Sequence, residues 1–283
     1  MRQRSLAIAL LGTILVLLMG ACSSSPEQAP AERSITSVEL IDRTLLFGNP
    51  SRFQGRLSPD GAQMSFRAPL DGVMNLWVAP AGNINAARPI TRNTGRGIPS
   101  HFWTLDSKSI LYIEDQNGDE NWHLYRVDLA SGQTKDLTPY PGVRANFIAQ
   151  SERHPGMAVI GMNDLDERWH DTYLVDIKTG KRTLLLENNG FSQVYVDNDL
   201  QVRLGTQQTQ TGGANLFKVQ GDAWIPFIEI PAEDIYTTSV VGFGADNKTF
   251  YMLDSRGRNF AALTRVNLAS GESNDLILME NAD

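Results

Sequence analysis

Apolar and polar positions alternate in short runs between residues 113 and 138. A polar loop at 115–121 separates one apolar run from a second run at 122–129, in which apolar side chains alternate with polar ones. The turn Ala130-Ser131-Gly132 leads into a last short run. Short runs with a two-residue period, bounded by polar turns, predict β-strands rather than helices. The segment therefore predicts strand, loop, strand, tight turn and strand.

The same arrangement repeats along the chain. Asp-Glu-Asn-Trp-His at 119–123 returns as Asp-Glu-Arg-Trp-His at 166–170, 47 residues later. A period of that size in a strand-rich chain is typical of propeller blades. We therefore predict an all-β fold, a β-propeller with about five four-stranded blades. The five units have turns at 58–61, 105–108, 154–156, 197–199 and 244–247, and later strands at 75–78, 123–125, 172–174, 215–217 and 262–264.

A second marker supports the repeat. The segments 128–132, 176–180 and 267–271 have the form Asp or Asn, three variable residues and Gly, and predict three copies of one hairpin turn. In the fourth unit the corresponding turn, at 219–222, has degenerated. Each blade would have an apolar face that only a neighbouring blade can cover.

The first residues have the pattern of a secretion signal. Arg2 and Arg4 precede an apolar segment at 6–19, which is short for a membrane span, and small residues precede Cys22. This arrangement resembles a bacterial lipoprotein signal, in which a peptidase cuts before the cysteine and the thiol carries diacylglycerol. An ordinary secretory signal is the alternative. We predict a signal peptide at 1–21 and lipidation of Cys22.

The next residues predict a tether and then the folded domain. Residues 22–34 are rich in Ser, Pro, Ala and Glu and lack large apolar side chains, so we expect a lipidated, flexible tether. A capping-box pattern at 36–39 predicts a short helix, and residues 35–283 are assigned to a partial propeller. Because Ser23 rather than Asp follows the cysteine, we expect the mature lipoprotein to lie in the bacterial cell envelope, on the periplasmic face of a Gram-negative outer membrane.

Charge and cysteine content narrow the functional classes. The chain has 32 acidic and 25 basic residues, a formal net charge of −7, and no basic cluster. This composition does not favour nucleic-acid binding. If its single cysteine, Cys22, is acylated, no disulfide can form within the chain, and the hydrophobic core must hold the fold.

Several segments together show a family resemblance, namely 46–50, 57–61, 75–78, 118–121 with 123–125, and 253–258. They resemble the N-terminal propeller of bacterial serine peptidases of the prolyl oligopeptidase family, in the branch of dipeptidyl aminopeptidases and acylaminoacyl-peptidases. The resemblance runs from about residue 35 to the C-terminus. It implies a seven-bladed propeller followed by an α/β-hydrolase domain that carries the catalytic Ser, Asp and His, with the propeller filtering substrates by size.

The chain departs from that family pattern in two ways. It has five blade-like units, and it lacks the Gly-x-Ser-x-Gly that places a nucleophilic serine at a strand-to-helix turn. The nearest segments, 190–194 and 271–275, lack the final glycine. We therefore expect no catalytic residues, a missing hydrolase domain, and bare apolar faces on the first and fifth units.

Two functional hypotheses remain open. In the first, the chain is a lipid-anchored, substrate-gating propeller of a peptidase, inactive alone, that is either a fragment or half of a split enzyme. A hydrolase domain or a second chain that supplies the missing blades would be its partner, and peptides are possible ligands. In the second, it is a free-standing propeller of the TolB-like kind that binds envelope proteins.

Seven residues of the second and third units are candidates for lining a cavity or a domain interface. A calcium loop is not favoured at 115–126, because Glu120 stands where glycine is needed and Arg126 where a bidentate Glu is needed. We predict no metal and no cofactor. His123 and His170 occupy equivalent places in the repeat, which favours a structural role for both. The candidates are Asp119, Glu120, His123, Asp166, Arg168, His170 and Asp171.

Overall fold

The computed structural model describes residues 40–279 and divides the chain into two units, 1–46 and 47–283. The predicted signal peptide, Cys22, the tether and the capping box all lie outside the described residues. The short helix α1 (Arg43–Phe47) begins beside Asp42, whose carboxylate accepts hydrogen bonds from the backbone N–H and hydroxyl of Thr44. Across residues 40–279, no helix is long and apolar enough to cross a membrane.

The predicted all-β fold with five four-stranded sheets is confirmed in the described residues of the second unit. Within each sheet consecutive strands pair antiparallel, so that every sheet is a meander of four strands. We call the sheets blades 1 to 5. Blade 1 has β1 (Phe53–Leu57), β2 (Gln63–Leu70), β3 (Val73–Pro80), the 3₁₀ turn η1 (Ile84–Ala86) and β4 (Arg88–Pro89); blade 2 has β5 (Ser100–Trp103), β6 (Ser109–Glu114), β7 (His123–Asp128) and β8 (Thr134–Asp136); blade 3 has β9 (Ala145–Gln150), β10 (Met157–Asp166), β11 (Trp169–Asp176) and β12 (Arg182–Leu186); blade 4 has β13 (Gln193–Val196), β14 (Val202–Gln208), β15 (Ala214–Gln220) and β16 (Ala223–Ile230); and blade 5, preceded by η2 (Ala232–Asp234), has β17 (Ser239–Phe243), β18 (Thr249–Asp254), β19 (Ala262–Asn267) and β20 (Ser273–Ile277).

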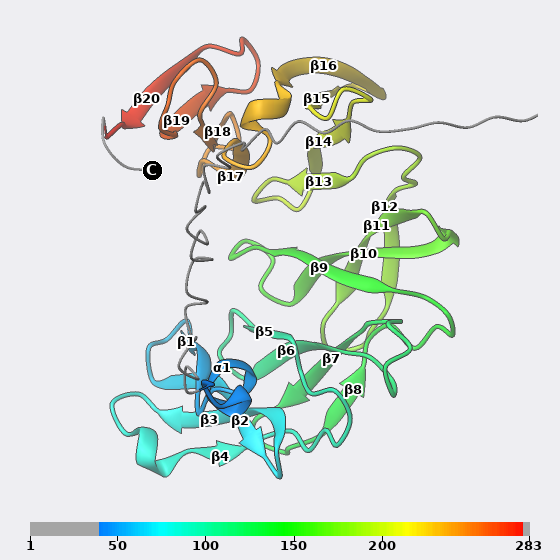
Figure 1. The fold of residues 1–283 in the computed structure, drawn as a ribbon. Coiled ribbons are helices and arrows are strands. Elements are labelled where there is room, and N and C mark those ends of the chain that lie inside the picture. Colours follow the sequence, from blue (N-terminus) through cyan, green and yellow to red (C-terminus); the bar gives the residue numbers. More distant parts are fainter. Residues whose placement is uncertain (1–39, 280–283) are drawn as a thin grey trace, which may run out of the picture. The chain divides into compact units, whose positions relative to one another are not determined.

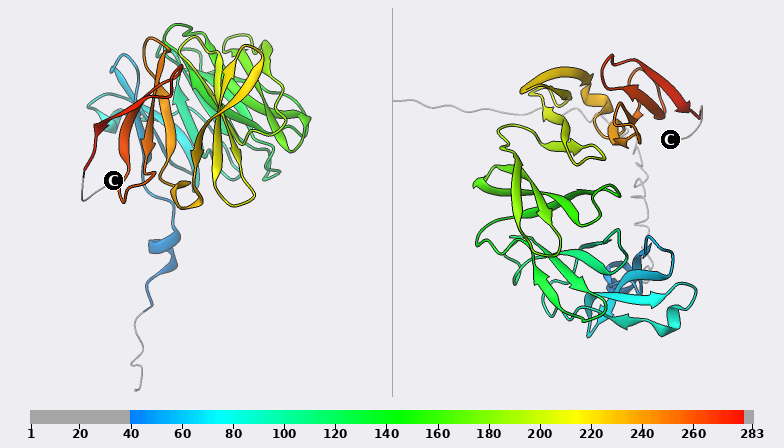
Figure 2. Two further views of the ribbon diagram at one scale, coloured as in Figure 1. Left: turned by 90° about the horizontal axis from the view of Figure 1, so that it is seen from above. Right: turned by 180° about the vertical axis from the view of Figure 1, so that it is seen from behind.

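The blades follow one another around an open arc in chain order (Figure 1). The first strand of each blade lies on the inner side of the arc, and the fourth strand lies on the outer side (Figures 1 and 2). The innermost strands therefore surround a common axis, as β5, β9, β13 and β17 show. About 45 to 50 residues separate each of these strands from the next in sequence.

The predicted hairpin turns form as expected. In the three copies, the backbone N–H of Gly132, Gly180 and Gly271 donates to the carbonyl of the residue four positions earlier, at 2.8 Å in each case. The three glycines have φ of +70°, +74° and +80°, a region that side chains with a Cβ rarely adopt. The side chain at the first position, for example Asp128 Oδ1, accepts from the N–H three residues later at 2.9 Å. This turn geometry explains why the same residue types recur.

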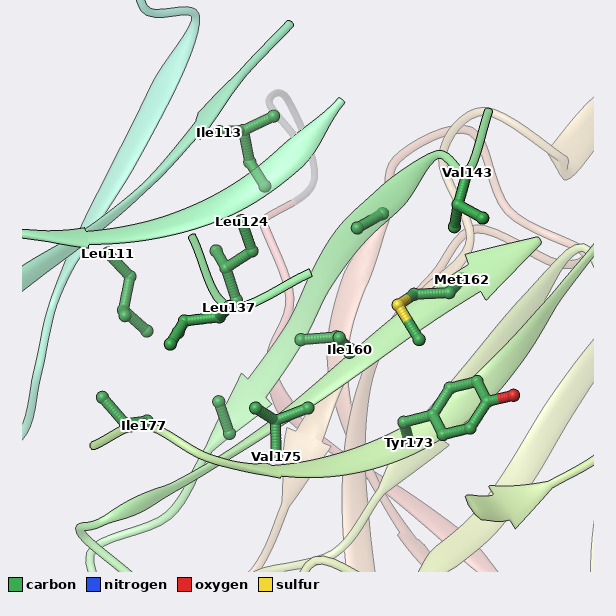
Figure 3. Close-up of a cluster of buried hydrophobic side chains, with 12 residues drawn as sticks. Leu111, Ile113, Leu124, Leu137, Val143, Ile160, Met162, Tyr173, Val175 and Ile177 are labelled. Atoms are coloured by element: carbon green, nitrogen blue, oxygen red, sulfur yellow. The ribbon is translucent and has the colours of Figure 1, made fainter. Parts of the chain in front are cut away.

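Buried apolar side chains join neighbouring blades. The largest cluster lies between blades 2 and 3 and includes Leu111, Ile160 and Val175, all fully buried (Figure 3). A second cluster joins blades 1 and 2, and a third joins blades 4 and 5. Such burial, worth about 25 cal/mol per Å² of apolar surface removed from water, is the main term that holds a propeller together.

One apolar face of blade 5 is bare, as the blade count predicts. Leu253, Leu263 and Ile277 are cross-strand neighbours on β18, β19 and β20. Leu253 is 42% exposed and Ile277 is 60% exposed. The face of blade 1 that points away from blade 2 is less bare than predicted: Leu57 on β1 is 65% exposed, but Phe66 and Ala68 on β2 are buried in a small cluster of the blade's own side chains.

Candidate functional site

A hollow of about 800 Å³ opens on the inner side of blades 3, 4 and 5. Its walls come from β9, β13 and β17, together with the start of β11 and the connection from blade 3 to blade 4. The lining mixes aromatic rings, such as Phe147 and Tyr195, with polar side chains. The polar side chains of the lining include Asn146, Gln150, Arg168, His170, Thr172 and Asn188.

A glycine makes room for His170 at the wall of this hollow. A Cβ at Gly161 on β10 would lie 2.2 Å from Asn146 Oδ1 and 3.1 Å from the His170 Cβ. Burial lowers the pKa of His170, and the positive charge of Arg144 lowers it further. The imidazole is therefore neutral at pH 7 and offers one donor and one acceptor.

Asn188 organises the connection between blades 3 and 4. Its side-chain oxygen accepts from the N–H groups of Gly190 and Phe191, at 3.1 and 2.8 Å. Its amide nitrogen donates to the carbonyls of His170 and Phe191, at 3.1 and 2.8 Å. The Asn188 N–H donates to Asp171 Oδ1 at 2.7 Å. These bonds fix the backbone that carries His170 and the Phe191 ring.

Some buried polar atoms at the site have no hydrogen-bond partner. The Thr172 hydroxyl is fully buried, lines the hollow and is unpaired, as is Gln150 Oε1. Asp171 Oδ2 is also buried without a partner among residues 40–279, but Asp171 does not line the hollow. An unpaired buried polar atom costs about 1–3 kcal/mol, so such atoms favour a ligand or ordered water that completes their bonds.

Arg168 lies at the rim of the hollow and is paired with Asp166. Two parallel hydrogen bonds, of 3.0 and 2.7 Å, join the guanidinium to the carboxylate at the exposed β10–β11 hairpin. This fork, together with the Arg168 N–H, lowers the pKa of Asp166 to about 2. The pair presents a fixed charge arrangement beside the hollow.

The candidates in blade 2 do not line the hollow. Asp119 closes its own loop by accepting from the N–H groups of Gln116 and Asn121, at 3.2 and 3.1 Å. Glu120 Oε1 lies 3.4 Å from Arg96 Nη1. His123 Nδ1 lies 2.7 Å from Asp136 Oδ2 on the adjacent strand β8, which is the structural role expected for this ring.

The expected equivalence of His123 and His170 is wrong. His123 lies five residues before the turn residue Asp128 and pairs with Glu114, and Asp171 lies five residues before Asp176 and pairs with Met162. Asp171 is therefore the counterpart of His123. His170 stands one position earlier, and because side chains alternate along a strand it points to the opposite face. One additional residue in the third unit causes this change.

One Ser–His contact resembles a nucleophile and its base. Ser65 Oγ and His101 Nε2 are 2.9 Å apart, but both residues are fully buried. The His101 Nδ1 has no partner, so no carboxylate orients the ring. In the described part of the chain, no group of three or more His, Cys, Asp or Glu side chains is arranged to hold a metal.

Sequence reasoning missed several lining residues. Asn188 lies in the segment Asn-Asn-Gly at 188–190, which by itself predicts only a turn, and Asn146 and Thr172 lie in runs typical of ordinary strands. One available signal is an aromatic residue on each innermost strand. These residues are Phe53, Phe102, Phe147, Tyr195 and Phe243.

The chain is similar to known peptidases over most of its length. It is 43% identical over 274 residues to dipeptidyl aminopeptidase BIII of Pseudoxanthomonas mexicana, a match that covers 96% of this chain and 40% of that enzyme. No family model matches. The predicted resemblance to the propeller of prolyl oligopeptidase-family peptidases is confirmed.

Solved structures show the same propeller fold. A prolyl endopeptidase matches with a TM-score of 0.57 at 10% identity, over 79% of this chain and 34% of that chain. The β-propeller domain of the Trilobed protease from Pyrococcus furiosus matches with a TM-score of 0.52 at 16% identity, over 82% of this chain and 73% of that domain. The chain thus spans well under half of the full-length enzymes, and most of the propeller domain solved alone.

Proposed function

We propose that the chain is the propeller of a prolyl oligopeptidase-family serine peptidase and controls which peptides reach a hydrolase domain. The observation that carries this proposal is the 43% identity to a dipeptidyl aminopeptidase over 96% of the chain. The hollow on the inner strands supports it, because its polar and aromatic lining suits a short peptide.

In this proposal the lining binds a peptide and takes no part in catalysis. Amides of a peptide need both donors and acceptors, and the side chains of Asn146 and Thr172 offer them. The sequence has no Gly-x-Ser-x-Gly, and the one Ser–His contact is buried without a carboxylate. The proposed role of these residues is therefore selection of substrates.

We place the hydrolase domain on the side of the propeller that carries the loops between second and third strands. Asp119 and Glu120 lie in the β6–β7 loop, and Asp166 and Arg168 lie at the β10–β11 hairpin. In a stack of equivalent meanders these loops share one side, which supports a common partner surface. The bare apolar face of blade 5 would be covered by further blades, on the same chain or on a second chain.

A chimera tests the proposed gating. The matched segment of the Pseudoxanthomonas mexicana enzyme would be replaced by the corresponding 274 residues of this chain. We expect the chimera to cleave a dipeptidyl chromogenic substrate and to reject a large unfolded substrate such as casein, as the unmodified enzyme control should. A folded, active chimera that degrades casein as readily as short peptides would contradict gating.

Inactivity of the isolated chain is tested with a fluorophosphonate probe. We expect no labelling of any serine and no hydrolysis of dipeptidyl or acyl-peptide chromogenic substrates. The intact Pseudoxanthomonas mexicana enzyme serves as the positive control. Stoichiometric labelling of one serine would show that this chain catalyses by itself.

Lipid anchoring is a separate proposal that rests on the sequence around Cys22. Acyl chains contribute about 0.8 kcal/mol per buried CH₂, so an acylated N-terminal cysteine would hold the protein on the outer membrane. Cys22→Ser should abolish lipid labelling and prevent maturation, whereas Ser24→Ala should not. If Cys22→Ser fractionates with membranes as the wild type does, the anchor is not at this residue.

A further inference from the structure

Blade 1 carries two arginines near the axis that have no acidic partner. Arg56 on β1 pairs in register with Ser65, and Arg67, two residues further along β2, pairs with Phe53. Both side chains therefore lie on the sheet face toward blade 2. Within residues 40–279, neither forms an ion pair, whereas eight arginines elsewhere do.

Aromatic rings hold both guanidinium groups in place. The Arg67 guanidinium carbon lies 4.8 Å from the centre of the Phe53 ring, and that of Arg56 lies 5.2 Å from the centre of the Phe102 ring. Phe102 on β5 stacks in turn on Phe147 of β9, with ring centres 4.1 Å apart. We call Phe53, Arg56, Arg67, Phe102 and Phe147 the arginine–phenylalanine patch. A stacked guanidinium loses little freedom when it binds a carboxylate.

The donors of this patch are incompletely used. Arg67 Nη1 donates to the Ile98 carbonyl at 2.8 Å, but its Nε is buried without a partner. The adjacent His101 ring is fully buried, contacts Ser65 through Nε2 and has an unpaired Nδ1. Burial, followed by the charges of Arg56 and Arg67, lowers the pKa of His101 to about 4, so the ring adds no charge of its own. These buried atoms are out of reach of a ligand, and the exposed Arg56 is the donor of the patch that an anionic ligand can contact.

A hollow of about 390 Å³ lies beside the patch, between blades 2 and 3. Phe102 and Phe147 line it, together with Trp122, Asn146 and the exposed Arg144, whereas Arg56 and Arg67 do not. The Arg56 guanidinium stacks on the Phe102 ring, so a peptide that lies on Phe102 and Phe147 has Arg56 beside it to bind a carboxylate.

We propose that the arginine–phenylalanine patch binds a carboxylate of an extended peptide, through charge-assisted hydrogen bonds to Arg56 and the positive charge of Arg67, with the neighbouring residue of the peptide lying on Phe102 and Phe147. The carboxylate belongs either to an acidic side chain or to the free C-terminus of the peptide. The inference rests on the proposed function in one respect, that the propeller admits peptides. It adds a preference for negatively charged peptides, set by blade 1.

Fluorescence anisotropy with the full-length protein and three labelled pentapeptides tests this preference. One peptide has a central Glu and an amidated C-terminus, the second has Gln and an amide, and the third has Gln and a free carboxylate. We expect the neutral peptide to bind about tenfold more weakly than at least one carboxylate peptide. Which carboxylate peptide binds more tightly identifies the source, a side chain or a C-terminus.

Variants then assign the effect to the patch. Arg56→Gln should lower the affinity for the tighter-binding carboxylate peptide about tenfold and leave the affinity for the neutral peptide unchanged. Arg67→Lys keeps the positive charge but loses the paired N–H donors of the guanidinium. It should lower the affinity for the same peptide by a smaller factor. The control is Arg265→Gln, which removes an exposed arginine of blade 5 that also lacks an ion pair.

Two results would overturn the inference in different ways. If all three peptides bind equally, or if Arg56→Gln behaves as Arg265→Gln does, the patch has no carboxylate preference and the proposed gating role survives. If no peptide binds at all, both the inference and the proposal that the propeller admits peptides fail.

Discussion

The interface between blades 2 and 3 differs from the interface between blades 3 and 4. The first is a continuous apolar cluster built around Leu111, Ile160 and Val175 (Figure 3). The second is joined by polar contacts, including the bond from Asn188 to Asp171 and the 2.7 Å ion pair of Arg153 with Asp199. In residues 40–279, no cluster of buried hydrophobic residues spans blades 3 and 4.

The difference shows how one repeat serves two purposes. Apolar packing depends on area and close fit, so the side chains of Leu111, Ile160 and Val175 are fully buried between blades 2 and 3. Hydrogen bonds need only a few well-placed atoms, so the contact between blades 3 and 4 can leave the 800 Å³ hollow beside it. We infer that the apolar cluster between blades 2 and 3 mainly supplies stability and that the polar interface between blades 3 and 4 leaves space for a ligand.

The largest expected effect comes from the apolar interface. Ile160→Ala should lower the free energy of unfolding by about 2–5 kcal/mol, because it opens a cavity in a fully buried site. Urea denaturation of the purified protein measures this. Leu165→Ala, at an exposed position on the same strand, should change stability by less than about 0.5 kcal/mol. Equal effects of the two variants would contradict the packing seen between blades 2 and 3.

The next prediction concerns His101, a buried titratable side chain in the interface between blades 1 and 2. The pKa of His101 is about 4 in the folded protein against 6.5 in the unfolded chain. The unfolded state therefore binds more protons between these values, so the stability is fully present above pH 6.5 and falls as the pH approaches 4. The loss should be on the order of 3 kcal/mol.

His101→Gln should flatten this pH dependence, because glutamine does not titrate and can still contact Ser65. Denaturant unfolding at several values between pH 4 and pH 7 measures the slope. The exposed His154→Gln should retain the wild-type slope. If both variants show the same slope as the wild type, another group is responsible.

The polar interface should respond to loss of hydrogen bonds rather than of volume. Asn188→Ala leaves the N–H groups of Gly190 and Phe191 and the carbonyl of His170 without their partner. We expect a loss of about 1–3 kcal/mol in unfolding free energy. The adjacent, exposed Asn189→Ala is the matched control and should be nearly neutral. A neutral Asn188→Ala would mean that the interface does not depend on these bonds.

The smallest effect concerns the unpaired hydroxyl in the hollow. Thr172→Val keeps the shape and removes a buried hydroxyl that has no partner, so stability should rise by about 1 kcal/mol or less. Binding of the neutral pentapeptide should weaken at the same time if this hydroxyl contacts ligand. Ser192→Ala, at an exposed position on the rim, serves as the control. Destabilisation by Thr172→Val would show that the hydroxyl is satisfied in the free protein.

Local signals in the sequence were sufficient to predict the blades. The turn ending in Gly132 and its copies need positive φ, and alternating apolar positions define strands of two-residue period. Both signals act over fewer than about ten residues, so they can be recognised without knowledge of the fold. The bare face of blade 5 followed from the number of units. Cys22 and the residues before it remain predictions, since they lie outside the described residues.

Only the tertiary structure decided which side chains meet. One extra residue in blade 3 turned His170 away from the position of His123 and into the hollow. Phe102 and Phe147, 45 residues apart, stack because β5 and β9 occupy the same place in neighbouring blades. A strand repeats its direction every two residues, so a single insertion reverses which face a side chain occupies. Contacts between blades depend on that register in two units at once, and for this reason the short-range pattern predicted the blades but not the composition of the hollow or of the arginine–phenylalanine patch.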